Sequence, residues 1–395
     1  MNILFLAPRL PYPIDTGGKI RTFHNLKQLA LRNNVDLVCF SFNKEDVKYE
    51  KIFQDMGINL CLIPATKLSG ISATISILFS KQPFAVDKYR SKNMLGMLEN
   101  LVGQEKYDIV HIDHIHMGQY VSRAWSIPSF IDEHNVEYRI LERCADVEGA
   151  SIKGWLYRAQ ARKMKSYEKE ILSMVKGGFA VSEDDAAILR ELTDNKSKIE
   201  IIPNGVDTEY FTSENIADEN ALVFTGSMDW MPNDDAMIYF CEEVLPLLNE
   251  KDLKIYIVGK DPSHKLKEFA KKDPQVVVTG RVDDVRTYIN KAKIFVVPLR
   301  IGGGTRLKIL EAMSMEKAVV STSIGAEGIA YTKGKDIMIA DTPEVFANTI
   351  RSLLSDTAKQ KFLGKNGREL VCSQYDWSIV GKKLNSIYEM VKTNG

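Results

Sequence analysis

Short apolar runs recur along the chain, and most are followed by a segment with helical spacing. In the first half, five such runs predict buried strands: Ile3 to Ala7, Val35 to Phe42, Ile109 to Ile112, Ser129 to Ile131 and Gly178 to Val181. A continuous apolar run is typical of a parallel strand that is covered on both faces. The segment from Thr22 to Arg32 has a helical pattern and predicts a helix after the first strand.

The same pattern begins again after the turn-forming residues 203–205 (Pro-Asn-Gly). Five more strands are predicted there: Leu222 to Thr225, Lys254 to Val258, Val276 to Val278, Ile294 to Val297 and Ala318 to Ser321. We therefore predict an α/β protein of two doubly wound, Rossmann-like domains. The first covers residues 1–205 and the second residues 206–376. An amphipathic helix over residues 377–395 is expected to return to the first domain.

Length and charge narrow the function classes. A chain of 395 residues suits two α/β cores better than one. Lys and Arg number 52, as do Asp and Glu, so the formal net charge is zero. Proteins that bind nucleic acid usually have a basic excess, and we expect no such partner. A local cluster of cations must hold any anionic ligand.

Cysteine usage and the N-terminus both favour the cytoplasm. The five cysteines are scattered and contain no C-x-x-C pair, which argues against disulfides and structural zinc. The apolar start lacks a basic leader and soon reaches Pro8, Pro11 and Pro13. The basic segment from Lys153 to Lys176 has two interpretations. A solvated domain helix is favoured over a helix that lies on the inner face of an anionic membrane, near a lipid-linked acceptor.

The strongest candidate site is the segment from Gly302 to Glu311. A predicted strand leads into Gly302, Gly303 and Gly304, and a helix is predicted to begin near Thr305. Glycines let a ligand approach the backbone, and the free N–H groups of a helix start favour phosphate. Arg306 and Lys308 add positive charge beside that helix start, and Glu311 can accept hydrogen bonds from a sugar diol.

Two further groups of residues follow predicted strands in the first half. Gly17 and Gly18 are expected in a loop after the first strand, near Thr16, Lys19 and Arg21. His134 follows another strand, and its neighbours Asp132 and Glu133 are candidates for setting its tautomer. The alternative for each is a structural role, as a turn or as a hydrogen-bonded histidine.

The residues 111–116 (H-I-D-H-I-H) suggest a metal site when taken alone. His114 and His116 would share one face if the strand continued through them, and His134 could add a ligand. The ordered zinc motifs are missing, so we predict no metal site and expect one histidine to face the ligand. A metallohydrolase that uses His111 to His116 is the alternative.

Several motifs together resemble the C-terminal domain of retaining glycosyltransferases of the GT-B fold, and most closely glycosyltransferase family 4. These are P-N-G-V-D at 203–207, T-G at 225–226, G-R-V-D-D at 280–284, G-G-G-T-R-L-K-I-L-E-A-M at 302–313 and S-I-G-A-E-G-I at 323–329. The Gly17-Gly18 segment and D-E-H-N-V-E-Y at 132–138 are similar to bacterial members that build polysaccharides. The similarity extends over essentially the whole chain.

The resemblance implies a retaining, metal-independent transferase whose two domains face a central cleft. A nucleotide-diphosphate sugar would be the donor, a saccharide or lipid-linked saccharide the acceptor, and no cofactor is needed. It assigns His134, Arg306 and Lys308 to catalysis. Donor binding would involve Gly17, Gly18, Gly226, Arg281, Val282, Gly303, Gly304, Thr305 and Glu311.

The chain departs from the family pattern at two places. The first Glu of the usual Glu-x7-Glu pair falls on Gly303, and Ser227 follows Gly226 where an Arg and a Lys are common. We infer that Arg306 and Lys308 take over the charge toward the diphosphate. The alternatives are a nucleotide-sugar epimerase or phosphorylase, or a non-catalytic sugar-nucleotide sensor on the same fold.

Overall fold

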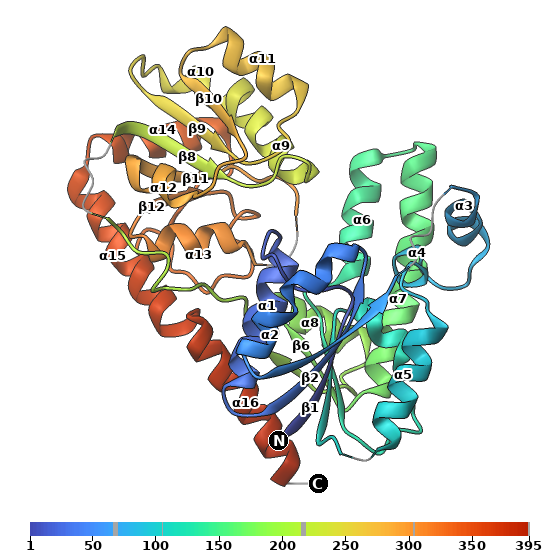
Figure 1. Cartoon of the computed structure of the whole chain (residues 1–395). Helices are drawn as coiled ribbons and strands as arrows, with labels where there is room; N and C mark the ends of the chain where they lie inside the picture. The colour runs from blue at the N-terminus through green and yellow to red at the C-terminus, as the bar shows by residue number, and fades with distance from the viewer. Residues whose placement is uncertain (66–69, 105, 215–218, 303–304, 394–395) are drawn as a thin grey trace. The chain divides into compact units, whose positions relative to one another are not determined.

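The computed structural model describes residues 1–65, 70–104, 106–214, 219–302 and 305–393. The chain forms two compact units, one of Met1–Pro203 with Val380–Gly395 and one of Asn204–Ile379. Each unit contains one parallel sheet with helices on both faces (Figure 1). The predicted pair of doubly wound α/β folds is confirmed.

The first unit is built on a sheet whose described strands run in the order β3-β2-β1-β4-β5-β6-β7, with every pair parallel. The strands are β1 (Asn2–Ala7), β2 (Asn34–Ser41), β3 (Ile58–Pro64), β4 (Ile109–Asp113), β5 (Ser129–Asp132), β6 (Gly177–Ala180) and β7 (Ile199–Ile201). Between β1 and β4 the register places Phe5 beside His111. The strand order reverses at this pair, so β1 and β4 form the switch point of the sheet.

Helices cover both faces of this first sheet (Figure 1). They are α1 (Gly17–Ala30), η1 (Lys44–Tyr49), α2 (Glu50–Asp55), α3 (Gly70–Phe79), α4 (Phe84–Asp87), α5 (Lys92–Gly103), η2 (Ile115–Tyr120), α6 (Glu137–Glu148), α7 (Ile152–Met174) and α8 (Glu183–Leu192). One face of β1 and β4 packs in a core with α5 and α7, which includes Leu4, Ile112 and Met164. Alternation along the strand sends Phe5 and His111 to the other face, where α1 and α16 pack.

The second unit repeats this plan. Its described strands run β10-β9-β8-β11-β12-β13, again all parallel, with the switch point between β8 and β11. They are β8 (Glu219–Thr225), β9 (Lys254–Val258), β10 (Val276–Gly280), β11 (Ala292–Val297), β12 (Ala318–Ser321) and β13 (Met338–Ile339). Leu222 and Phe224 belong to one core and Val223 to another, because successive side chains of a strand point to opposite faces.

The helices of the second unit are α9 (Met231–Tyr239), η3 (Phe240–Val244), α10 (Leu245–Leu248), α11 (His264–Lys272), α12 (Arg286–Lys291), α13 (Leu307–Ser314), α14 (Pro343–Leu354) and α15 (Thr357–Gln374). The last helix, α16 (Trp377–Thr393), begins here, but from Val380 it belongs to the first unit. There Asn33 Nδ2 donates to Asn385 Oδ1 at 2.7 Å. The predicted return of the final helix to the first domain is confirmed.

All ten predicted strands exist, and β9 and β12 have the predicted ends. The prediction missed β3, β7 and β13. These strands lie at or next to sheet edges, where partial exposure weakens the apolar signal. The helix after β1 was predicted to begin at Thr22, but α1 begins at Gly17. Gly17 and Gly18 were predicted in a loop, but they are the first two residues of this helix, and neither has a positive φ.

Candidate functional site

The candidate residues gather at the carboxyl ends of strands beside the two switch points, where open α/β sheets bind ligands. In the first unit, Asp113 ends β4, Asp132 ends β5 and Gly18 is the second residue of α1, the helix that follows β1. In the second unit, Gly226 follows β8, and Lys308 is in the first turn of α13. The two clusters belong to different units and are described in turn.

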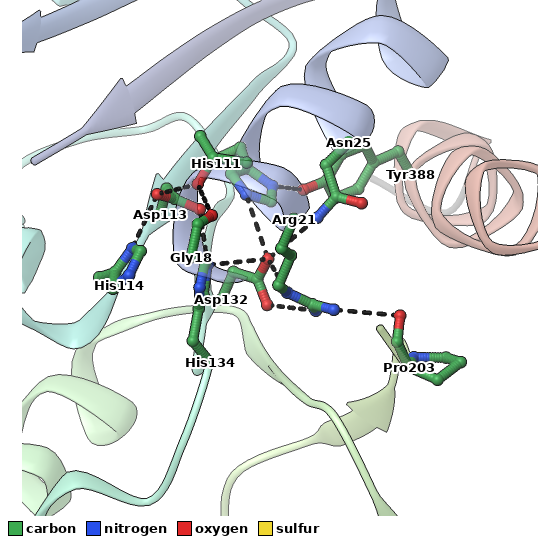
Figure 2. A network of polar contacts seen from close by, with 11 residues as sticks. Gly18, Arg21, Asn25, His111, Asp113, His114, Asp132, His134, Pro203 and Tyr388 are labelled. Carbon is green, nitrogen blue, oxygen red and sulfur yellow. Dashed lines mark hydrogen bonds and ion pairs between the residues drawn. The ribbon is translucent and has the colours of Figure 1, made fainter. Parts of the chain in front are cut away.

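A buried ion pair anchors the cluster of the first unit (Figure 2). The Arg21 guanidinium donates to both oxygens of Asp132, with distances of 3.0 and 2.7 Å. Each side chain is only 1% exposed. Arg21 also donates to the carbonyl of Pro203 at 3.1 Å, and Asn25 donates to Asp132 at 3.2 Å. This network fixes α1 to the carboxyl end of β5, so Arg21 has a structural position and does not face a ligand freely.

Asp113 organises two histidines in the same network. One carboxylate oxygen lies 2.8 Å from His134 Nε2, and the other lies 2.8 Å from His114 Nδ1. Thr22 also donates its hydroxyl to Asp113 at 2.8 Å. Burial alone would raise the pKa of Asp113, but the two imidazoles and their hydrogen bonds hold it well below its usual range. Asp113 is therefore a carboxylate, and both histidines donate an N–H to it.

The tautomers leave a second nitrogen on each ring. In the neutral forms, His134 Nδ1 and His114 Nε2 become hydrogen-bond acceptors. A Cβ at Gly18 would stand 3.3 Å from His114 Nε2 and 3.8 Å from His134 Nδ1, so both nitrogens face the first turn of α1. Gly18 is needed for this space and not for a positive φ. The predicted tautomer partner of His134 was wrong: Asp113 fills that place, while Asp132 is 3.9 Å from Nε2 and both oxygens of Glu133 lack a hydrogen bond.

The histidines from 111 to 116 do not form one set. His111 is fully buried, its Nδ1 lies 2.5 Å from the Tyr388 hydroxyl, and burial lowers its pKa to about 4. The strand ends at Asp113, and His114 has φ 67°, a conformation rare for a residue with a side chain. The strand therefore does not carry His114 and His116 on one face as predicted. His116 instead packs beside Tyr89, with ring centroids 5.9 Å apart.

Among the residues that the structure describes, two overlapping groups have potential metal-ligating atoms within 4.8 Å of one another. One is Asp113, His114 and His134, and the other is His111, Asp113 and Asp132. In the second group, the Arg21 guanidinium already provides the positive charge next to Asp132, which disfavours a metal cation there. In the first group, hydrogen bonds among the three side chains occupy both oxygens of Asp113.

The cluster of the second unit centres on Lys308. Its Nζ donates to Asn233 Oδ1 at 2.8 Å and lies 3.8 Å from the centre of the Phe224 ring. A Cβ at Gly226 would stand 2.6 Å from Nζ, and Gly226 has φ 157°. Glycine at 226 therefore makes room for the ammonium group at the carboxyl end of β8. Asn233 in turn donates to the Ser227 carbonyl at 2.8 Å, which orients its oxygen toward Lys308.

Two titratable groups in this cluster have shifted pKa values. Burial lowers the pKa of Lys308 to about 7, helped by the positive charge of Arg306 and opposed by Glu311. Burial raises the pKa of Glu311 to about 7, opposed by Lys308. Shifts of this size are typical of functional sites, and an anion beside Lys308 would return it to the charged form.

The other predicted donor-site residues differ in their positions. Thr305 is buried, and its hydroxyl is 3.4 Å from the Gly328 carbonyl. Arg281 is exposed after β10, and Val282 packs on the core of the α13 face. Among the described residues, no polar contact joins Arg281 to Lys308. Gly303 and Gly304 lie outside the described residues. The helix predicted to begin near Thr305 begins at Leu307.

Two family models match the chain. Residues 219–356 match the model described as "Glycosyl transferases group 1", and residues 16–210 match "Glycosyltransferase Family 4". The chain therefore contains a glycosyltransferase Family 4 domain followed by a group 1 glycosyltransferase domain. Its enzyme class is therefore sugar transfer, as predicted. The group 1 match contains Gly226 and Lys308, and the Family 4 match contains Gly18, Asp113 and His134.

The chain is also similar to curated proteins and, in its fold, to a solved structure. The glycosyltransferase is 23% identical over 391 residues to an "Uncharacterized 44.6 kDa protein in cps region" of Klebsiella pneumoniae, covering 95% of this chain and 96% of that protein. It is 24% identical to the "Capsular polysaccharide biosynthesis glycosyltransferase CapM" of Staphylococcus aureus, over 35% of this chain and 38% of that one. The fold matches HepE of Anabaena, solved with UDP-glucose, with a TM-score of 0.68 at 12% identity over 99% and 100% of the chains.

Sequence reasoning missed the partners that three residues hold in this glycosyltransferase: Asp113 holds His134, Asn233 holds Lys308, and Arg21 pairs with Asp132. Asp113 lies within the histidine-rich run, so its charge was a usable signal. Asn233 contacts a lysine 75 positions away, and no local pattern predicts that contact.

Among the described residues, no helix is both long and apolar enough to cross a membrane.

Proposed function

We propose that this glycosyltransferase moves a sugar from a nucleotide-diphosphate donor to a saccharide or lipid-linked saccharide acceptor, in polysaccharide or glycolipid synthesis. The anomeric configuration is retained, and no metal takes part. The CapM relative, named for capsular polysaccharide biosynthesis, supports the process. The HepE structure with UDP-glucose supports the donor class. All five cysteines are free thiols, which suits a cytoplasmic location.

One observation carries the proposal: a lysine ammonium held at the switch point of the second sheet. Asn233 and the Phe224 ring fix Lys308 Nζ beside Gly226, in the part of the chain that matches the group 1 family. A protonated amine has three N–H donors, and Asn233 accepts one of them. The remaining donors are available to a phosphate, and Arg306 adds a second positive charge nearby.

The charges suit the departure of a nucleoside diphosphate. In the reaction, the bond between the anomeric carbon and the donor phosphate oxygen breaks, and the acceptor oxygen forms a bond to the same carbon. Negative charge develops on the leaving diphosphate, and Lys308 and Arg306 would stabilise it. The acceptor proton moves to a donor phosphate oxygen on the same face of the sugar. Retention then needs no side-chain nucleophile.

In the first unit, we assign His134 to sugar positioning. Its Nε2–H is committed to the Asp113 carboxylate, so Nδ1 is an acceptor for a sugar hydroxyl. Gly18 leaves that nitrogen uncovered. A carboxylate that fixes one ring nitrogen prevents the imidazole from exchanging tautomers when substrate binds, which keeps the hydroxyl in one orientation.

The same charges support chemistry without a metal. Lys308 and Arg306 would provide the positive charge that a divalent ion gives to phosphate in metal-dependent transferases. The sequence also contains no D-x-D motif of the kind that holds such an ion. Transfer at full rate in EDTA is the expected result.

A non-catalytic sugar-nucleotide sensor is the second candidate. Gly303 stands where the family pattern has the first Glu of Glu-x7-Glu, so one carboxylate of that motif is missing. Such a sensor would bind a nucleotide sugar with the same Lys308 cluster but would release no nucleoside diphosphate, with or without acceptors.

The test is a transfer assay with a panel of nucleotide-diphosphate sugars and saccharide acceptors in EDTA. Release of nucleoside diphosphate and the anomeric proton coupling of the product are both measured. Transfer with retained configuration supports the proposal. Donor binding without release of diphosphate on any acceptor supports the sensor, and inversion of configuration contradicts the proposed chemistry.

A further inference from the structure

Two adjoining hollows lie in the first unit next to the histidine cluster. The outer one has a volume of about 1020 Å³, and the inner one about 290 Å³. Asp113, His114 and Gly18 line the inner hollow, so it reaches His114 and the carboxylate that holds His134. Four residues line both hollows and therefore lie where they meet: Arg9, Lys19, Lys88 and Tyr89.

Two cations at this meeting point have no carboxylate partner. Arg9 donates to the Tyr89 hydroxyl at 2.9 Å, and Lys88 Nζ lies 4.9 Å from the centre of the same ring. Among the described residues, neither cation has an Asp or Glu oxygen within ion-pair distance. Tyr89 thus holds both charges at one wall, while the third cation there, Lys19, pairs with Asp15 at 3.0 Å.

The carboxylates that line the hollows already have partners, so they do not neutralise this pair. Besides Asp15, Glu45 pairs with Lys48 at 2.7 Å. Asp46 accepts from the Ser41 hydroxyl at 2.9 Å, and Asp113 binds the histidines. Glu137 accepts a hydrogen bond from Asn135. Glu137 also interacts electrostatically with Lys88 but forms no ion pair with it, so among the described residues neither Arg9 nor Lys88 is paired with a carboxylate.

A buried histidine lies beside these cations. His116 is 9% exposed, it lines the inner hollow, and its ring nitrogens have no hydrogen-bond partner among the described residues. Burial first, and then positive neighbours that include Lys88 and Arg9, keep the pKa of His116 well below its usual value. The ring nitrogens of His116 are not among the buried atoms that lack a partner, so they are open to the hollow, where a ligand can accept the N–H.

Aromatic rings line the outer hollow as well. Tyr12 and Tyr49 lie with their ring centroids 5.0 Å apart, and Phe42 and Tyr89 lie 6.3 Å apart. A groove with aromatic walls and a few fixed polar groups is the usual form of a small-molecule site. Its volume accommodates more than one sugar ring, and its inner end reaches the histidine cluster.

We propose that the acceptor of this enzyme carries an anionic group, a phosphate or a carboxylate, that binds Arg9, Lys88 and His116. The inference rests on the proposed function and specifies the acceptor class. Arg9 gives a forked pair of donors, Lys88 a point charge and His116 an N–H. Bound there, the anion directs the adjoining sugar toward His114 and Asp113, which line the inner hollow. A phosphate would come from a lipid-linked or phosphorylated glycan, and a carboxylate from an acidic sugar.

The first test compares one saccharide acceptor in neutral, uronate and phosphate forms. Arg9→Met and Lys88→Met should each raise KM for the anionic form by about tenfold, the effect of losing one charge-assisted hydrogen bond. KM for the neutral form and donor hydrolysis should not change. Lys48→Met is the matched control, because Lys48 lines the same groove but is paired with Glu45. Preference for the phosphate or the uronate form identifies the source of the anion.

The second test needs no turnover. Protein with labelled histidines is titrated with inorganic phosphate and with methyl glucuronide, and the ring signals of His116 are followed by NMR. Saturable shifts of His116 that weaken in Arg9→Met support the site even if no transfer occurs, so this result is separable from failure of the proposed function. The inference is overturned if neither anion shifts His116, or if Lys48→Met weakens acceptor binding as much as Arg9→Met.

Discussion

Replacing Lys308 with Met should abolish most of the transfer rate without unfolding the protein. When protonated, the ammonium group gives one hydrogen to Asn233 Oδ1 at 2.8 Å and keeps two for the diphosphate. Two unit charges about 4 Å apart interact by about 4 kcal/mol at an effective dielectric constant of about 20. Loss of one such contact in the transition state lowers kcat by about 10²–10³-fold. Methionine has a similar length and fits the space beside Phe224.

The assay is steady-state release of nucleoside diphosphate, together with urea unfolding of each variant. Burial of the Lys308 amine lowers its pKa to about 7, so the folded protein gains little from its charge and Lys308→Met should keep its stability. Lys293→Met is the control, because Lys293 also contacts an asparagine, Asn220 Oδ1 at 3.3 Å, but lies at the amino end of β11. A Lys308→Met variant that retains more than about a third of wild-type kcat would refute the assignment, since loss of one transition-state contact predicts a far larger effect.

Three further predictions concern space, pairing and pH. Gly18→Ala should lower kcat at unchanged or higher Tm, because the added Cβ would stand 3.3 Å from His114 Nε2. The control is Gly96→Ala, which lies in open space on α5 and should raise Tm without changing kcat. Equal activity of the two variants would contradict this prediction. Arg21→Met should lower the free energy of unfolding, measured in urea, by about 3–5 kcal/mol, because it leaves the buried Asp132 carboxylate unpaired. A decrease under about 1 kcal/mol would mean that the ion pair contributes no more than an exposed one. As pH rises through about 7, Lys308 loses its proton, so kcat/KM for the donor should fall, and a profile that stays flat to pH 9 would oppose this. The pKa of Lys308 is about 7 in the folded protein and ordinarily 10.5, so between pH 7 and 10.5 the unfolded chain binds more protons than the folded one. The contribution of Lys308 to the free energy of unfolding therefore rises with pH across this window.

The sequence predicted those parts of the fold whose signal is local. Each buried central strand is a compact apolar run, and β9 from Lys254 to Val258 was predicted to the residue. The edge strand β7 has only three residues, two of them half-buried, so its pattern resembles a loop. Gly17 and Gly18 suggested a loop because glycine is common in turns, yet Arg21 and Asp132 pair across the first unit and hold α1 in place from its first turn.

The candidate site was predicted in part for the same reason. Residue types that suit phosphate and sugar, such as Lys308 and His134, could be recognised one at a time. Their positions depend on contacts between distant parts of the chain: Asn233 holds Lys308, and Asp113 holds His134. The tautomer of His134 and the space at Gly226 follow from these contacts, and no spacing rule contains them.

The central claim is that a nucleotide-diphosphate sugar binds the second unit through protein cations. Its most direct test is calorimetric titration of a panel of such sugars, in EDTA, against the wild type and Arg306→Ala. Selective binding that persists in EDTA and is lost in the variant is the predicted result. Absence of binding for every nucleotide sugar, or binding that requires a divalent metal, would contradict the claim and direct attention to the group of Asp113, His114 and His134.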